Sequence, residues 1–172
     1  MSKGTLPEDR MLVYRIVSNK YASSLYASGL PGRWNQRGEL VIYTAASAEI
    51  ALLENMAHRM GQGGFMSNAF ACMEIDVPST SVQVLKKEDL PADWSSASPY
   101  SQTQNLGSSW YQGQKDLLLQ VPSAPAPTGS NYLINTTHPL YREVQLIKSY
   151  PYPIDHRFAE LDKDLRQYLK KK

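Results

Sequence analysis

Four side chains on separate segments could act chemically on a ligand: Arg15, Tyr43, Glu54 and Ser123. A carboxylate that is partly shielded from water, as we expect for Glu54, can act on a group in a cleft. The planar guanidinium of Arg15 suits phosphate or carboxylate groups. Ser123 opens a proline-rich turn, which would hold its hydroxyl at a fixed place. Such a site needs elements that bring these side chains together.

Residues 40–60 are predicted to form a strand, a turn and a helix. This unit supplies Tyr43 at the end of the strand and Glu54 on the second turn of the helix. Ser47 is a good helix N-cap. Gly61 is a good stop signal.

Helical periodicity places Glu54 at the border of the predicted apolar stripe of this helix. The residues expected to form that buried stripe are Leu53, Met56, Ala57 and Met60. A border position lets a carboxylate be half-buried and still reach a cleft. The alternative is an exposed Glu54 that contacts only His58, one turn later.

Residues 12–17 alternate as a strand, which places Arg15 on the same face as Val13 and Val17. Two interpretations are open for an arginine flanked by valines. It could lie on an edge strand and extend its head group to water. It could instead lie at the floor of a pocket and bind an anion.

The turn-rich segment 29–38 contains Arg33, Trp34 and Asn35. Loops that carry aromatic and charged residues are often binding sites. The alternative is a connecting loop in which Trp34 covers the core and Arg33 is solvated.

Residues 117–121 are an apolar run typical of a central strand, and they lead directly into the turn that begins with Pro122 and Ser123. The segment 131–139 is expected close to this turn. A Ser–His–Asp triad using Ser123 and His138 is not favoured, because no nucleophile-elbow sequence surrounds the serine.

Further strands are predicted at residues 71–77, 81–86 and 143–150, and further helices at residues 103–114 and from Phe158 onward. Short connections favour antiparallel pairing. We therefore expect an α+β fold of mostly antiparallel sheets with short helices, in a single domain of 172 residues. Its core would span residues 12–157, followed by a C-terminal helix and tail at 158–172.

The composition is that of an ordinary globular protein, with 42% hydrophobic and 20% charged residues. There is no apolar run long enough for a membrane span and no apolar leader at the N-terminus, so we expect a cytoplasmic protein. The single cysteine, Cys72, is expected to be buried. The three histidines lack metal-ligand spacing, so no metal site is expected.

The formal net charge of +2 comes from 18 basic and 16 acidic residues. Residues 155–172 hold six of the bases and four of the acids, so the remaining body has twelve of each sign. A balanced body argues against a basic nucleic-acid-binding face.

The order of these segments resembles the RES domain family, from Val13 to about Arg157. The matching stretches are Tyr14-Arg15-Ile16, Gly32-Arg33-Trp34-Asn35, Val41 to Ala45, Ala51-Leu52-Leu53-Glu54, Thr103-Gln104 with Leu106-Gly107 and Trp110, Val121-Pro122-Ser123, Asn131 to Asn135, and His138-Pro139. No single stretch is specific, but the ordered set is.

The resemblance implies a toxin of a bacterial type II toxin–antitoxin pair with an ADP-ribosyltransferase-like fold. Such toxins act on NAD⁺, which they hydrolyse, phosphorolyse or use to transfer ADP-ribose to a protein. NAD⁺ would be the substrate, and no separate cofactor is required. The expected partner is an Xre-type antitoxin whose C-terminal segment blocks the active site. A homodimer or a toxin–antitoxin assembly is expected on the same ground.

The resemblance also assigns roles. Arg15 would hold the pyrophosphate, Tyr43 would form an aromatic wall, Glu54 would stabilise positive charge on the ribose, and Ser123 would contact the ligand and position Glu54. Further NAD⁺ contacts are expected from Arg33, Asn35, Tyr132 and Asn135. A different class of function, an RNA-binding or non-catalytic module that uses the basic tail and exposed aromatic rings, is the remaining alternative.

Overall fold

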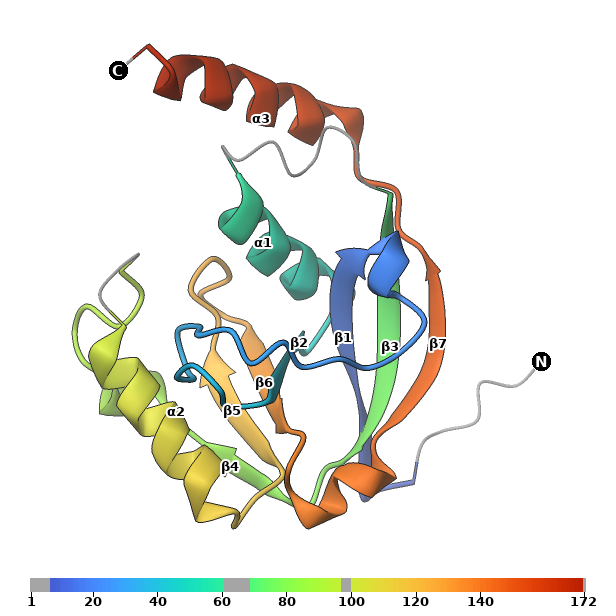
Figure 1. Cartoon of the computed structure of the whole chain (residues 1–172), viewed down its shortest axis with the longest axis vertical. Coiled ribbons are helices and arrows are strands. Elements are labelled where there is room, and N and C mark those ends of the chain that lie inside the picture. Colours follow the sequence, from blue (N-terminus) through green and yellow to red (C-terminus); the bar gives the residue numbers. More distant parts are fainter. Residues whose placement is uncertain (1–6, 61–68, 97–99, 172) are drawn as a thin grey trace.

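The structure is a computed structural model that describes residues 7–60, 69–96 and 100–171. In these ranges the chain forms seven strands and three α-helices (Figure 1). The strands are β1 (Arg10–Ser18), β2 (Val41–Ala45), β3 (Phe70–Pro78), β4 (Val82–Val84), β5 (Leu118–Pro122), β6 (Ser130–Asn135) and β7 (Gln145–Pro151). The α-helices are α1 (Ala48–Arg59), α2 (Ser101–Gly113) and α3 (His156–Leu169).

The strands form one sheet in the order β4-β5-β6-β2-β1-β3-β7. Only β4 and β5 are parallel, so the predicted α+β fold with mostly antiparallel strands is confirmed. A single residue pair, Tyr14 with Ala45, joins β1 to β2. The sheet therefore opens into two halves, which splay apart with α1 at the open end (Figure 1).

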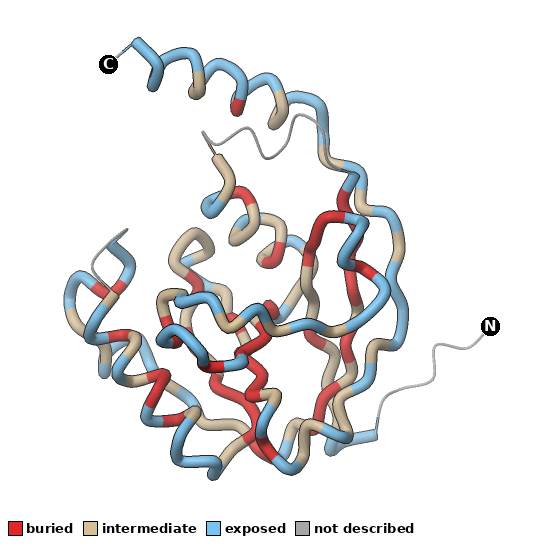
Figure 2. Tube along the Cα trace, viewed as in Figure 1, coloured by how far each residue is buried: buried red, intermediate tan, exposed pale blue. Residues whose placement is uncertain are grey.

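The main core lies where the two halves of the sheet face each other. Val13, Ile42, Met73 and Ile134, from both halves, are completely buried there. Figure 2 shows this buried interior running along the strands, whereas α3 is mostly exposed. Cys72 is also completely buried, as predicted.

Two strand predictions agree with the structure. The run at residues 117–121 is predicted to be a central strand, and β5 is an interior strand, second from the edge, whose leucines are buried because both of its faces are covered. Pro151 is predicted to end the last strand, and it is the last residue of β7. A proline is tolerated there because β7 is an edge strand, where a missing N–H costs no ladder hydrogen bond.

Helix α1 begins as predicted, since the Ser47 side chain accepts a hydrogen bond from the Ile50 N–H. Gly61, the predicted stop, lies outside the described residues. The predicted buried stripe is wrong in part, because Leu53 is 41% exposed and Ala57 is also exposed.

The buried side of α1 is instead centred on Ala51 and Met56, which pack with Ile16 and Phe70. Asn55 contributes to this rotation, because its Nδ2 donates a hydrogen bond to the Ile16 carbonyl at 3.0 Å. Contacts with β1 and β3 therefore set which side of the helix is buried.

Helix α2 supports the segment that contains Trp34. As predicted, Trp110 points inward, with 3% of its surface exposed. Gly107 lies so close to the Trp34 carbonyl that a Cβ atom at this position would be 1.7 Å from the carbonyl oxygen. Gln104 donates a hydrogen bond to the Gly32 carbonyl at 2.8 Å. A helix without a side chain at residue 107 is needed for this close packing.

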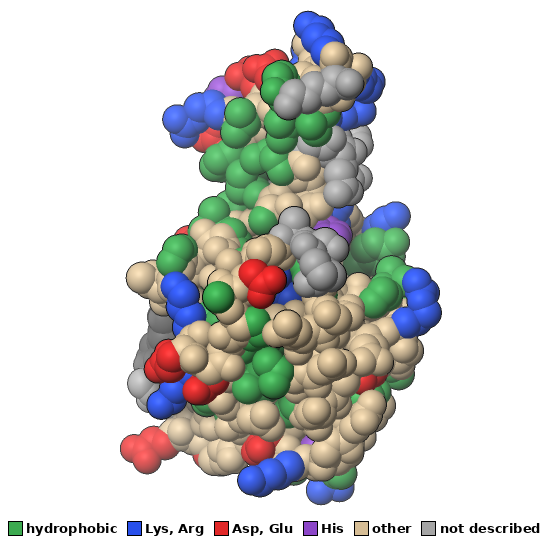
Figure 3. All heavy atoms as spheres, turned by 90° about the vertical axis from the view of Figure 1, so that its left-hand side faces the viewer, with side chains coloured by type: hydrophobic (Ala, Val, Ile, Leu, Met, Phe, Trp, Pro, Cys, Tyr) green, Lys and Arg blue, Asp and Glu red, His purple; other side chains and the backbone are tan. Residues whose placement is uncertain are grey.

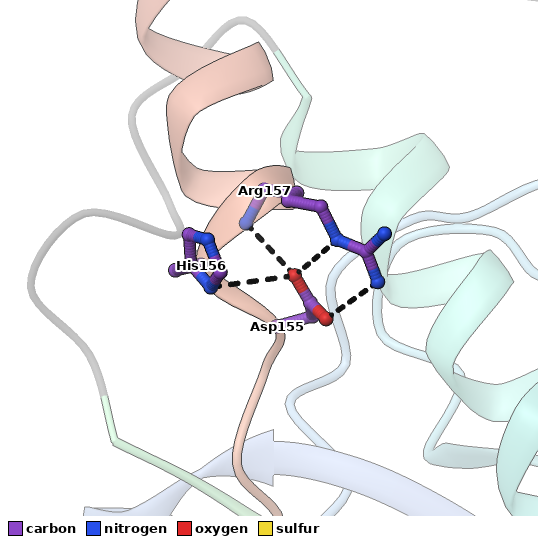
Figure 4. A network of polar contacts seen from close by, with 3 residues as sticks. All are labelled: Asp155, His156 and Arg157. Atoms are coloured by element: carbon purple, nitrogen blue, oxygen red, sulfur yellow. Dashed lines mark hydrogen bonds and ion pairs between the residues drawn. The ribbon is translucent and has the colours of Figure 1, made fainter.

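Helix α3 begins at His156, two residues before the predicted start, and Asp155 is its N-cap (Figure 4). The Asp155 carboxylate accepts hydrogen bonds from the Arg157 backbone N–H and from its guanidinium, each at 2.9 Å. These hydrogen bonds from Arg157 lower the pKa of Asp155. Phe158 packs against the body, but Leu161 and Leu169 are 53% and 52% exposed.

Candidate active site

Glu54 is the centre of a polar cluster built from three elements. Its Oε1 accepts a hydrogen bond from Ser123 Oγ at 2.7 Å and another from Asn131 Nδ2 at 2.6 Å. Ser123 and Asn131 are buried, whereas Glu54 is half-buried. Glu54 is half-buried and binds Ser123, as predicted, although the buried side of α1 differs from the stripe whose border Glu54 is expected to mark.

The turn after β5 orients the Ser123 hydroxyl. Its oxygen accepts a hydrogen bond from the Ala126 N–H at 3.2 Å, so its proton is directed to Glu54. The turn is closed by the Ser123 N–H, which donates to the Gly129 carbonyl at 3.0 Å. A Cβ at Gly129 would lie 2.7 Å from Ile50 Cδ1, so the glycine lets the turn approach α1. In this arrangement Ser123 is a donor to Glu54 and not an activated nucleophile.

Tyr43 uses its hydroxyl to hold the segment that contains Trp34. The hydroxyl donates to Asn35 Oδ1 at 2.7 Å and accepts from the Trp34 N–H at 3.1 Å. Burial raises the pKa of Tyr43, the Trp34 hydrogen bond lowers it, and the carboxylates of Glu39 and Glu54 raise it further. The charge of Glu54 therefore contributes to the raised pKa of Tyr43, with burial as the main cause.

Asn35 is an internal support of its loop. It is 2% exposed, and its Nδ2 donates to the carbonyls of Leu30 and Gln36 at 2.9 and 3.0 Å. Its Oδ1 is used by Tyr43. Both ends of the amide are therefore bound within the protein, and the predicted NAD⁺ contact stays a prediction without support from this geometry.

Arg33 binds the segment before α2. Its guanidinium donates to the carbonyls of Trp94 and Ser96 and lies 4.7 Å from the centre of the Tyr100 ring. The alternative interpretation, in which Arg33 is solvated, is therefore wrong, because its guanidinium connects two loops.

Arg15 lies on an interior strand, so the interpretation as an edge-strand arginine is wrong. Its guanidinium donates to the Tyr26 carbonyl at 3.0 Å, and no described residue forms a salt bridge with it. Burial lowers the pKa of Arg15, and this effect is opposed by Tyr141.

The strand register separates Arg15 from the face of the sheet that carries Tyr43. Tyr14 is paired with Ala45, so it shares a face with Ala45 and, by alternation, with Tyr43. Arg15 therefore projects from the opposite face. The described hydrogen bonds join Ser123 and Asn131 to Glu54, and none of them joins Arg15 or Tyr43 to this carboxylate.

Asn135 and Tyr132 occupy different environments, although both belong to β6. Asn135 is completely buried, donates to the Tyr111 carbonyl at 3.0 Å, and accepts from Thr137. Tyr132 packs against the main core, on the face opposite Asn131. Asn135 therefore supports the chain locally, and ligand contacts by either residue stay predictions.

His138 lies beyond the C-terminal end of β6, whereas Ser123 lies beside the N-terminal end of that strand. Its Nδ1 accepts a hydrogen bond from the Leu140 N–H at 3.2 Å. His138 is therefore a cap of the following turn, which agrees with the expectation that it does not activate Ser123.

Two polar residues of this region are not among the predicted site residues. Asn131 binds Glu54 directly, and its position directly after the proline turn could have indicated this. Glu39 is 7% exposed and accepts from the Gln36 N–H at 2.7 Å and from Ser108 Oγ at 2.9 Å. The sequence carries no signal that pairs Glu39 with Ser108, which is 69 residues away.

Within the described ranges, no group of three His, Cys, Asp or Glu side chains is arranged to hold a metal ion. No α-helix in the same ranges has the length and apolar character needed to cross a membrane.

Comparison with known proteins agrees with the resemblance found in the sequence. The chain is 30% identical over 158 residues to Toxin Res of Photorhabdus laumondii subsp. laumondii, a match that covers 89% of this chain and 100% of that protein. It is 37% identical over 111 residues to the Prs ADP-ribosylating toxin of Sphingobium sp. strain YBL2, covering 63% of this chain and 68% of that protein.

The fold is similar to that in the crystal structure of the M. tuberculosis MbcT-MbcA toxin-antitoxin complex. The TM-score is 0.68 at 20% identity, covering 92% of this chain and 90% of the matched chain. The model of the RES domain matches residues 12–155. Since that match takes in most of β1, the other six strands and helices α1 and α2, the chain belongs to the RES domain family.

Proposed function

We propose that this protein is the toxin of a toxin–antitoxin pair and that it consumes NAD⁺ by cleaving the bond between nicotinamide and ribose. The observation that carries the proposal is the Glu54 carboxylate, which two donors hold from neighbouring segments while its Oε2 has no hydrogen bond from a described residue. Family membership and the names of the relatives support the same proposal.

The fixed position of the Glu54 carboxylate suits a reaction in which positive charge develops on the ribose. Cleavage of this bond passes through an oxocarbenium-like ribose, as in glycoside hydrolysis. Nicotinamide leaves as a neutral molecule, so no strong acid is required. A fixed carboxylate such as Glu54 stabilises the developing charge because it needs little reorganisation during the reaction.

Only part of the ligand can be assigned to residues near Glu54. The Arg15 guanidinium has no salt bridge to a described residue, as an anion clamp requires. It projects from the opposite face of the sheet, however, so its contact with the pyrophosphate stays a prediction. The Tyr43 ring is the candidate wall for nicotinamide, and its hydroxyl holds the adjacent loop. Asn35 and Asn135 have their amides bound internally, so we assign them no ligand contact.

A decisive test is the substitution Glu54→Gln. The glutamine side chain would lack the charge but could still accept from Ser123 and Asn131, so the fold should be retained. Loss of NAD⁺ followed with purified protein should slow by at least about 1,000-fold if the charge is needed. The matched control is Glu49→Gln, on the same helix, where the carboxylate is exposed. Wild-type NAD⁺ loss in Glu54→Gln would exclude the proposed role.

Transfer of ADP-ribose to a protein is the second candidate, favoured by the similarity to the Sphingobium toxin. The same carboxylate would serve, and only the acceptor would differ. Labelled NAD⁺ incubated with cell lysate separates the reactions, since transfer labels a protein band. Hydrolysis releases free ADP-ribose, and phosphorolysis requires added phosphate.

RNA binding receives less support from the distribution of charge. Figure 3 shows Lys and Arg side chains scattered over one face of the body among acidic ones, with further bases at the C-terminal helix. Nucleic-acid binding needs a continuous basic surface.

We also propose an Xre-type antitoxin as the partner of this protein. Co-expression of the antitoxin is expected to prevent the loss of cellular NAD⁺.

A further inference from the structure

Asn131 is buried, yet only one end of its amide is paired. The residue is 8% exposed, its Nδ2 donates to Glu54 Oε1 at 2.6 Å, and its Oδ1 is buried without a hydrogen-bond partner. Buried polar atoms in proteins are nearly always paired. An unpaired acceptor at this position therefore needs a physical explanation.

The chemistry of the partner determines which end of the amide is unpaired. An ionised carboxylate can only accept hydrogen bonds, so the Asn131 atom that contacts Glu54 must be the NH₂ group. The reversed amide would press one acceptor oxygen against another. The amide cannot turn over to pair its oxygen without giving up its contact with Glu54.

The position of Asn131 is set by the sheet. Asn131 is paired with Ala45 on β2 and with Val121 on β5, so its backbone is fixed on both sides. Glu54, by contrast, projects from a helix on a long side chain. Asn131 therefore connects a rigid strand to the carboxylate and, together with Ser123, restrains Oε1.

We infer that Asn131 is a positioning residue whose function is to orient Glu54. The unpaired Oδ1 lowers the stability of the fold, and it is retained because the Nδ2 of the same amide is needed to hold Glu54. This inference rests on the proposed cleavage of NAD⁺. An apolar side chain of similar volume would remove the unpaired oxygen and pack at least as well. Functional sites commonly retain groups that lower stability in this way.

The test compares two substitutions with a matched control. Asn131→Asp keeps the shape of the side chain but replaces the donor by an acceptor and adds a negative charge, and Asn131→Leu removes both polar ends. Asn55→Leu is the control, because Asn55 lies next to Glu54, also has a buried unpaired Oδ1, and donates to a backbone carbonyl instead. NAD⁺ turnover and melting temperature are measured for all three variants and the wild type.

We expect kcat to fall up to about 100-fold in both Asn131 variants, as for a small misplacement of a catalytic group, with little change in KM. The kcat of Asn131→Asp should fall at least as far as the kcat of Asn131→Leu, since two carboxylates would then face each other. The melting temperature of Asn131→Leu should equal or exceed that of the wild type. Asn55→Leu should retain the wild-type kcat.

Different failures have different meanings. A wild-type protein that does not consume NAD⁺ overturns the proposed function and this inference with it. A wild-type protein that consumes NAD⁺, together with an Asn131→Asp variant of unchanged kcat, overturns the inference alone. Loss of kcat that merely follows a loss of melting temperature in all three variants would show a structural role only and would also overturn the inference.

Discussion

The position of Glu54 on its helix does not by itself indicate a catalytic role. On the helix it is simply a carboxylate at the edge of an apolar stripe. Its candidacy as a catalytic group comes from Ser123 and Asn131, which lie 69 and 77 residues away in the chain and both bind Oε1. Two donors bind one oxygen, and the other oxygen accepts no hydrogen bond from a described residue.

Tyr43→Phe separates the two roles of this tyrosine. The hydroxyl bridges the Trp34 N–H and Asn35 Oδ1, so its removal leaves two groups unpaired in a largely buried place. We expect the free energy of unfolding to fall by about 1–3 kcal/mol, measured by urea denaturation. Tyr132→Phe is the control, because its hydroxyl forms no hydrogen bond within the described residues. Equal stability of both variants would mean that only the Tyr43 ring matters.

The packing of α2 on the segment around Trp34 is the clearest requirement among the elements. Gln104 and Ser108 on α2 bind Gly32 and Glu39, and Gly107 between them allows close approach. The same segment is also held by Tyr43, whose hydroxyl accepts a hydrogen bond from the Trp34 N–H. A disturbance of α2 should therefore reach the neighbourhood of Glu54 through this segment.

Gly107→Ala tests this packing. The new Cβ would meet the Trp34 carbonyl oxygen at 1.7 Å, so the helix and the segment would have to separate. We expect a loss of about 3 kcal/mol in the free energy of unfolding, measured by chemical denaturation. Gly113→Ala, in the last position of the same helix, meets no atom within 4 Å and should be neutral or slightly stabilising. An equally small effect at residue 107 would contradict the close approach of α2 to Trp34.

At the scale of the molecule, several tyrosines on and beside the sheet are partly buried. The pKa values of six are raised, with burial the largest cause for all except Tyr150, where the hydrogen bond with Cys72 ranks first. These residues are Tyr14, Tyr43, Tyr132, Tyr141, Tyr150 and Tyr152. Most of the phenols should therefore remain neutral in the folded protein at a pH where an unfolded chain ionises.

This difference predicts alkaline destabilisation. Above about pH 10 the unfolded chain loses phenolic protons that the folded protein keeps, so the free energy of unfolding falls as pH rises. Tyr43 alone would contribute a slope of up to about 1.4 kcal/mol per pH unit. Urea denaturation at several pH values, with phenolate absorbance followed in parallel, measures the effect. Tyr43→Phe should flatten the slope, and a stability independent of pH in this range would contradict the prediction.

The sequence by itself determined the three α-helices, six of the seven strands and their order, whereas β6 is not predicted as a strand. Ser47 begins α1 through a local hydrogen bond, and the spacing of Trp110 predicts an inward-facing helix, because both signals act within one or two turns. The ordered set of short motifs indicated the RES family and paired Glu54 with Ser123 by role. The division into one domain with a separate tail is a prediction of the same origin that the structure does not test.

Only the tertiary structure decided which side chains are available at the site. Leu53 is exposed because contacts with β1 and β3 set the rotation of α1. Arg33 is bound by a segment 61 residues away, and Asn35 is bound by its own loop and by Tyr43 on β2. Asn131 reaches Glu54 because strand register brings β6 alongside β2. These outcomes depend on long-range packing and pairing, which local sequence patterns do not encode.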